Sequence, residues 1–180
     1  MGKYLDDNPN CMRRKRGKRI KKRINLAVQI GAHCGIKSEA MERRGLAVAA
    51  AVRALETQGY AVAVTVFSYS KHDDHNGLRS IEIKKSDQYV DPAITAYWLA
   101  HTTAFRRIMF KLYENTPNDL SIGYGYGSNR TLPTDQRKEK FGMDAVVLNS
   151  ESITNDRKVS DYQAEIVKAV KEQSGIELQY

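Results

Sequence analysis

The sequence has few cysteines and no long apolar run, and both absences exclude classes of protein. Only Cys11 and Cys34 are present in 180 residues, too few for the disulfide framework of a small secreted domain. No stretch approaches the roughly 20 apolar residues that a helix needs to cross a bilayer. The N-terminus also lacks the apolar core of a signal peptide. We therefore expect a cytoplasmic protein without a membrane span.

The chain does contain a dense basic run near its start. The whole chain has 29 Lys and Arg against 21 Asp and Glu, and without the nine cations of this run the balance is 20 against 21. The formal charge of +8 therefore belongs to a basic arm, residues 1–23, joined to a near-neutral body, residues 24–180. The nine cations are Arg13, Arg14, Lys15, Arg16, Lys18, Arg19, Lys21, Lys22 and Arg23.

Such a run is typical of a protein that contacts a polyanion. Nine positive charges in eleven residues repel one another, and we expect nucleic acid, DNA or RNA, to neutralise them through its phosphates. An acidic protein or an anionic membrane is the alternative partner, and the membrane is disfavoured because no apolar helix face flanks the run. A solvated tail with no partner is the remaining interpretation.

The body alternates strands and helices. A buried strand, a helix of about twenty residues and a second apolar strand predict a right-handed βαβ unit. The third strand alternates apolar and polar residues and ends in Lys84-Lys85, as expected of an antiparallel edge strand protected against further pairing. The elements expected are strands at 24–32, 60–68, 80–84, 144–149 and 176–179 and helices at 38–58, 91–114 and 156–174.

This order predicts a single α/β domain of three layers, with a Rossmann-like, mostly parallel sheet and one antiparallel edge strand. Residues 116–143 are expected to form a long irregular loop, and loops of this length tend to be functional. Helix ends carry their own signals, with Asp91-Pro92 at the start of the second helix and Gly59 and Gly175 as left-handed stops.

Ligands of such sheets bind outside the carboxyl ends of the strands, which points to residues 31–37. Gly31 and Gly35 are too few for a dinucleotide fingerprint, so a structural turn is the main interpretation. An anion site is one alternative. A reactive Cys34 with His33 as its base is another, although neighbours in sequence usually point apart.

Two further clusters have a chemical and a structural interpretation. His72, Asp73, Asp74 and His75 include the ligand types of zinc, but four adjacent side chains radiate outward, and we expect a polar turn with no metal or cofactor. In the glycine-rich stretch 123–127, Tyr124 and Tyr126 could stack on unpaired bases while Arg130 contacts phosphate. The alternative is that both rings fold back over the core.

Several short stretches carry a resemblance to known families. They are Tyr4-Leu5, residues 8–12, Arg43-Arg44-Gly45 through Glu56, residues 100–107 with Phe110 and Glu114, and Gly123-Tyr124-Gly125. With its elements in this order the chain resembles the von Willebrand factor A type of Rossmann-like domain, whose third strand is also an antiparallel edge. It further resembles an uncharacterised family of phage and prophage proteins with a degenerate domain of this type.

The resemblance implies a phage protein that is located in the host cytoplasm or the virion. It also implies a shortened member of the family, from which a preceding segment is missing. A typical A domain binds its metal through Asp-x-Ser-x-Ser after the first strand, whereas residues 29–35 contain neither Asp nor Ser. Metal-dependent adhesion is therefore not expected, because hard cations need oxygen ligands.

The function expected from the sequence is non-enzymatic, non-specific binding of nucleic acid through the basic arm. The first alternative is a protein-interaction module or component of a phage assembly, whose arm docks on an acidic partner. The second is an enzyme that uses Cys34 and His33.

Overall fold

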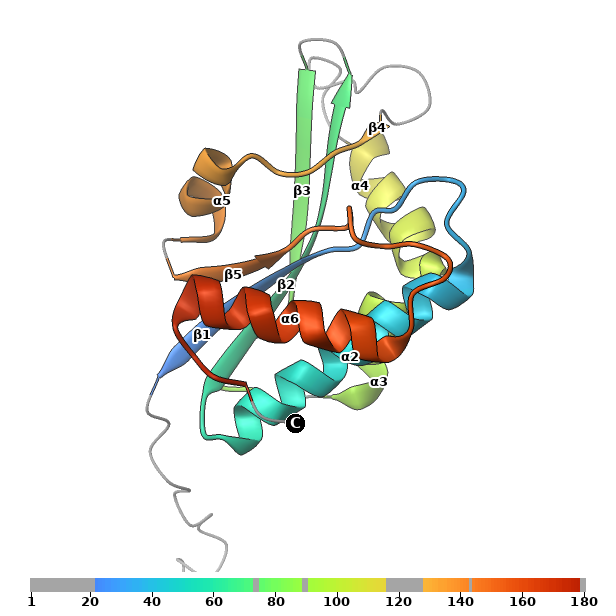
Figure 1. The fold of residues 1–180 in the computed structure, drawn as a ribbon. Coiled ribbons are helices and arrows are strands. Elements are labelled where there is room, and N and C mark those ends of the chain that lie inside the picture. The colour runs from blue at the N-terminus through green and yellow to red at the C-terminus, as the bar shows by residue number, and fades with distance from the viewer. Residues whose placement is uncertain (1–21, 73–74, 89–90, 116–127, 143, 179–180) are drawn as a thin grey trace, which may run out of the picture.

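A mixed sheet forms the centre of the molecule, in a computed structural model that describes residues 22–72, 75–88, 91–115, 128–142 and 144–178. The strand order is β3-β2-β1-β5 (Figure 1). β1 runs parallel to β2 and β5, whereas β2 and β3 are antiparallel. The strands are β1 (Arg23–Gln29), β2 (Ala61–His72), β3 (His75–Lys84) and β5 (Ala145–Leu148), and β4 (Ser128–Asn129) pairs with β2.

This arrangement confirms the predicted α/β class and the antiparallel edge strand in third position. The helices are α2 (Ser38–Thr57), α3 (Pro92–Ala100), α4 (Phe110–Glu114), α5 (Thr134–Phe141) and α6 (Val159–Ser174), with a π-helix η1 (Ala104–Met109) between α3 and α4. Among the described residues, no helix is long and apolar enough to span a bilayer.

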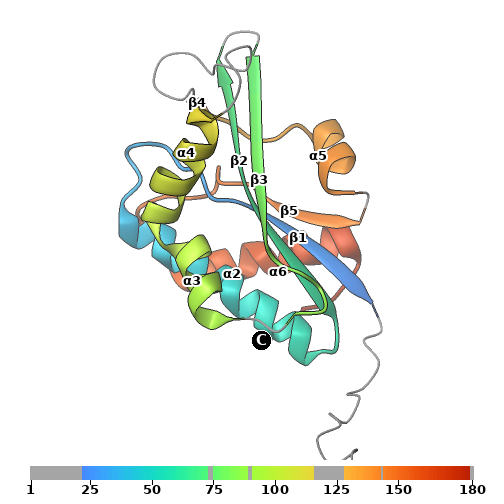
Figure 2. The ribbon, with the colours of Figure 1, turned by 180° about the vertical axis from the view of Figure 1, so that it is seen from behind.

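The two faces of the sheet are covered unequally. α2, α3 and α6 lie together on one face (Figures 1 and 2), where every second strand residue joins the main core. On the opposite face a smaller core gathers around Phe67 and Leu132, and α5 packs there through Phe141, whose ring centroid is 5.1 Å from that of Phe67. Three layers are therefore present, and near the start of β1 the thin layer leaves Asn25 exposed.

α2 and α3 cross closely at Gly45. A Cβ atom at this position would lie 2.4 Å from the carbonyl oxygen of Leu99 and 2.5 Å from Cα of Ala100. Only glycine allows two backbones to approach this closely, since any side chain would overlap main-chain atoms that cannot rotate away. The crossing brings α3 onto the same face as α2.

The predicted continuous helix 91–114 is wrong at His101. Asp91 caps α3 as expected, because its Oδ1 accepts the amide of Ala93 at 2.9 Å. The backbone is extended at His101, with φ −94° and ψ 121°, and His101 Nδ1 then accepts the amide of Thr103 at 3.3 Å, capping the next helical segment. Within α3, Ile94 and Tyr97 are 49% and 39% exposed.

Other boundaries also differ from expectation. β1 ends at Gln29 and not at 32, and the hairpin is longer, so Asn76 and Gly77 lie inside β3. The expected irregular loop contains α5 and β4, and residues 176–178 form no strand. Helix stops at Gly59 and Gly175 are confirmed, with φ of +91° and +70°.

Lys84 does not protect the sheet edge as a solvated charge. Its side chain is only 3% exposed, and its ammonium group donates to the carbonyl oxygen of Val62 at 2.5 Å and lies 2.7 Å from Glu56 Oε1. Lys84 therefore joins the edge strand to β2 and α2 from the inside.

Candidate functional site

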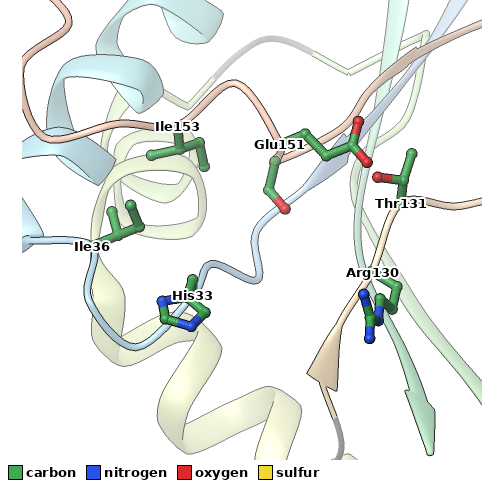
Figure 3. Close-up of a pocket in the computed structure, with 7 residues that line it drawn as sticks. His33, Ile36, Arg130, Thr131, Glu151 and Ile153 are labelled. Carbon is green, nitrogen blue, oxygen red and sulfur yellow. The ribbon is translucent and has the colours of Figure 1, made fainter.

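A pocket of about 280 Å³ opens at the carboxyl ends of β1 and β5 (Figure 3). This is the end of the sheet at which ligands of α/β domains bind, outside the carboxyl ends of the parallel strands. Three segments meet in it: the loop after β1, the loop after β5 and the chain after β4. Its lining residues are His33, Ile36, Arg130, Thr131, Ser150, Glu151 and Ile153.

Gln29 joins two of the segments that form this crevice. Its side chain is fully buried; Oε1 accepts the amide of Ser150 at 3.1 Å and Nε2 donates to the carbonyl oxygen of Arg130 at 2.8 Å. One amide therefore fixes two of the three segments against each other. The sequence pattern did not single out Gln29.

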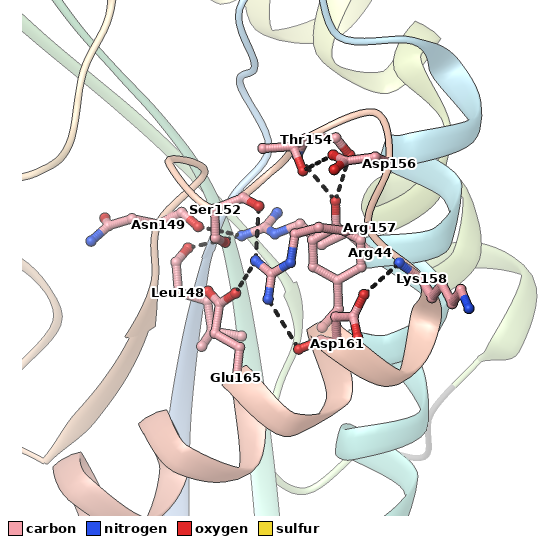
Figure 4. A network of polar contacts seen from close by, with 11 residues as sticks. Arg44, Leu148, Asn149, Ser152, Thr154, Asp156, Arg157, Lys158, Asp161 and Glu165 are labelled. Atoms are coloured by element: carbon pink, nitrogen blue, oxygen red, sulfur yellow. Dashed lines mark hydrogen bonds and ion pairs between the residues drawn. The ribbon is translucent and has the colours of Figure 1, made fainter.

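Arg44 fixes the crevice from the side of α2 (Figure 4). It donates to the carbonyl oxygens of Leu148 at 3.2 Å and Asn149 at 2.9 Å, and to that of Gln29 at 2.8 Å. Burial lowers the pKa of this guanidinium to about 10, against the opposing influence of Glu165. The guanidinium remains charged at neutral pH and ties together the carbonyl ends of two neighbouring parallel strands.

The loop after β5 is held by its own polar contacts (Figure 4). Arg157 donates to the carbonyl oxygen of Ser152 at 2.8 Å and forms an ion pair with Glu165 at 2.6 Å. Asn155 reaches the loop after β1, where its Oδ1 accepts the amide of Lys37 at 2.8 Å. Both walls of the crevice are thus joined by side chains.

The crevice presents groups of both charges beside an uncommitted hydroxyl. Arg130 and Glu151 are exposed, and within the described part of the chain their side chains form no hydrogen bond or ion pair. Thr131 Oγ1 is buried and has no hydrogen-bond partner there. This set suits a small polar ligand that carries an anionic group and a hydrogen-bond donor.

Cys34 and His33 lie closer together than expected of sequence neighbours. The Cys34 Sγ is 3.9 Å from both ring nitrogens of His33, so the expectation that they point apart is wrong. His33 Nδ1 also accepts the amide of Gly35 at 3.2 Å, which leaves Nε2 as the nitrogen not bound to the backbone. Cys34 is exposed and free.

The basic arm is described only at Lys22 and Arg23, both exposed. The Lys22 carbonyl oxygen accepts the amide of Ala61 at 3.0 Å, so Lys22 already belongs to the sheet. The crevice lies at the other end of β1, and the seven residues of the strand separate the two by roughly 20 Å. The remaining arm cations, Tyr124 and Tyr126 lie outside the described residues.

Arg130 is therefore placed at the crevice, at the opposite end of β1 from Lys22 and Arg23. At residues 72–75, where a polar turn without a metal was expected, the backbones of His72 and His75 pair across the hairpin, and Asp73 and Asp74 lie outside the described residues. Elsewhere in the described ranges, no three His, Cys, Asp or Glu side chains are grouped so as to hold a metal ion.

Residues 1–177 match the family described as "Domain of unknown function (DUF7192)". The chain belongs to this DUF7192 family. No curated protein and no solved structure matches the sequence. The match covers the basic arm as well as most of the body. The comparisons give no support to the resemblance to phage proteins or to the von Willebrand factor A type, which stays a prediction.

Proposed function

We propose that the protein binds nucleic acid non-specifically through its basic N-terminal arm and has no catalytic activity of its own. The concentration of charge carries this proposal: nine cations stand in residues 13–23, and the rest of the chain has 20 cations against 21 acidic residues. The last two cations, Lys22 and Arg23, are exposed where the arm meets β1. The phosphate backbone of a nucleic acid is the polyanion whose charge density matches such a run.

We also infer that the domain is of the von Willebrand factor A-like, Rossmann-like type. The order β3-β2-β1-β5 with an antiparallel third strand supports this inference. A phage origin, with the protein in the host cytoplasm or the virion, rests on the sequence resemblance alone.

The test is a salt titration of DNA and RNA binding by the full chain. Arg13, Arg14, Lys15 and Arg16 are replaced by Gln, while Lys22 and Arg23 stay because they belong to the sheet. We expect weaker binding and a logarithmic salt slope reduced by about 0.9 for each duplex phosphate that the arm no longer neutralises. The matched control replaces four exposed body cations, Arg53, Lys85, Arg106 and Arg107, by Gln. Equal affinity and slope in the wild type and the arm variant would refute the proposal.

The first alternative is a protein-interaction module whose basic arm docks on an acidic partner, and the nine cations of residues 13–23 support it as they support nucleic acid. This alternative predicts a stoichiometric complex with an acidic protein that survives nuclease treatment. If nuclease treatment releases every partner captured with the protein, nucleic acid is favoured as the ligand.

The second alternative is an enzyme that uses Cys34 and His33, whose side chains are neighbours, although the thiol is 3.9 Å from each ring nitrogen and is directed at neither. It predicts that the rate of thiol alkylation at Cys34 is higher at neutral pH in the wild type than in His33→Gln. Equal rates in both proteins would remove this alternative.

A further inference from the structure

A second groove lies on the thinly covered face of the sheet, at the amino end of β1. Its volume is about 170 Å³, and it is formed by β1, β2, β3 and the end of α5. The side chains that matter for its chemistry are Arg23, Asn25, Thr65, Glu82, Lys140 and Phe141.

The polar side chains of this groove are uncommitted. Arg23, Asn25, Glu82 and Lys140 are exposed, and Thr65 is half-buried. With the rest of the described chain, none of these five side chains forms a hydrogen bond or an ion pair. They retain their full capacity for a ligand, unlike Gln29 and Arg44, whose side chains are satisfied within the protein.

The arrangement of the groups fits a nucleotide. Arg23 and Lys140 supply positive charge for phosphates. The amide of Asn25, the hydroxyl of Thr65 and the carboxylate of Glu82 can pair with the donors and acceptors of a base edge. Phe141 offers an aromatic side chain, and its contact with Phe67 holds the ring in place.

The size of the groove and its position select the form of nucleic acid. A space of about 170 Å³ suits one unpaired base, whereas in a duplex the bases are paired and stacked inside the helix. Arg23 is both the last cation of the basic arm and the first residue of β1. A single-stranded nucleic acid whose phosphates contact the arm therefore lies close to the groove.

We propose that this groove binds an unpaired base of a single-stranded nucleic acid whose neighbouring phosphates contact the basic arm. The inference rests on the proposed function, because the arm supplies most of the affinity. The groove adds a preference for single strands, through hydrogen bonds to the base and contact with Phe141.

The test compares a short single-stranded oligonucleotide of mixed sequence with its duplex, using fluorescence anisotropy and the full chain. In the double variant Asn25→Ala and Lys140→Ala we expect affinity for the single strand to fall about five- to tenfold and its salt slope by about 0.7. Duplex affinity should change less than about twofold, because the arm is intact. Lys138→Ala is the matched control: it is exposed on α5 and does not line the groove.

The outcomes separate this inference from the proposed function. If the arm variant loses binding and the groove variant loses none, the groove inference is overturned and the proposed function stands. If the wild type binds neither oligonucleotide, both fail. If the groove variant loses affinity equally for the single strand and the duplex, the inference is also overturned, because the groove residues then act only through their charge.

Photo-crosslinking gives a readout that does not depend on substitution. Wild-type chain bound to an oligonucleotide carrying a photoreactive base should crosslink at Lys140, Phe141 or a neighbouring groove residue. Crosslinks confined to other parts of the body would overturn the inference. Poly-glutamate serves as an acidic probe. If the groove variant binds poly-glutamate more weakly than the wild type but binds the single strand equally well, an acidic protein segment is the occupant of the groove. This outcome would also overturn the inference.

Discussion

At the scale of single residues, Arg44 carries a positive charge that is 4% exposed and satisfied by three main-chain carbonyl oxygens. Replacing it by Met removes all three bonds and leaves the carbonyl oxygens of two strands without these donors. We expect the free energy of unfolding to fall by about 3 kcal/mol, measured by urea denaturation. Arg53→Met, at an exposed position of the same helix, should change it by less than about 0.5 kcal/mol. A comparable loss in both variants would contradict the role given to Arg44.

At position 45, in contrast to position 44, the fold requires that there be no side chain. Ala is about 1 kcal/mol better than Gly within a helix, yet a Cβ atom here would lie 2.4 Å from Leu99 O. We expect Gly45→Ala to lower the free energy of unfolding by about 2 kcal/mol, because α3 must move away. Leu46→Ala, at the exposed neighbouring position, is the control for a substitution on α2. A stabilised Gly45→Ala protein would show that the helices separate without cost.

Asp156 provides a test by pH. A hydrogen bond from Thr154 Oγ1 at 2.7 Å is the main cause that holds the Asp156 pKa below 3.8. Since the folded pKa lies below the unfolded one, the stabilisation is present above pH 3.8 and is lost as the pH falls through the folded pKa. Thr154→Val should raise the pKa of Asp156 in a carboxyl-carbon NMR titration. An unchanged pKa would assign the shift to other groups.

At the scale of elements, the break between α3 and η1 depends on a histidine. His101 Nδ1 accepts the amide of Thr103 at 3.3 Å, and its ring stacks on Tyr97 with centroids 5.8 Å apart. We expect His101→Ala to lower the free energy of unfolding by about 1 kcal/mol, the usual effect of losing a helix cap. His101→Asn, which keeps an acceptor, should recover most of this loss in the same denaturation measurement. No recovery would indicate that the stacking contact matters more than the cap.

The elements that the sequence predicts correctly are those whose apolar periodicity is strong. β1, α2, β2, β5 and α6 place apolar residues at regular spacing, because one side of each faces the main core. α5 cannot be recognised in this way because TDQRKEKF contains a single large apolar residue, Phe141, and none of its residues is buried. The break at His101 is hidden because both helical segments face the same core, so the apolar spacing continues across it.

The crevice could be located from topology, but its key side chains could not be named from composition. Nothing in an isolated Arg or Gln distinguishes a buried side chain from an exposed one. A signal was nevertheless present at Arg44, which occupies an apolar position of α2 between the buried residues Met41 and Val48. A polar residue inside an apolar stripe indicates a buried partner, and here the partners are the ends of β1 and β5.

At the scale of the whole molecule, we expect the charge of the basic arm to contribute to nucleic-acid binding and not to the stability of the fold. If the arm acts through its charge alone, replacing Arg13, Arg14, Lys15 and Arg16 by Gln should leave the free energy of unfolding within about 0.5 kcal/mol of wild type. The same variant should lose affinity for nucleic acid, measured at matched ionic strength. A large loss of stability would instead show that the arm contributes to the fold.

Gln29 and Arg44 also determine how the molecule opens. Between them they connect α2, the ends of β1 and β5 and the chain at Arg130. Segments linked in this way cannot fluctuate one at a time, so the amides of Val28 and Leu148 should exchange their hydrogens only when the whole body unfolds. A ligand held in the crevice would consequently slow hydrogen exchange across the entire sheet and not merely around itself.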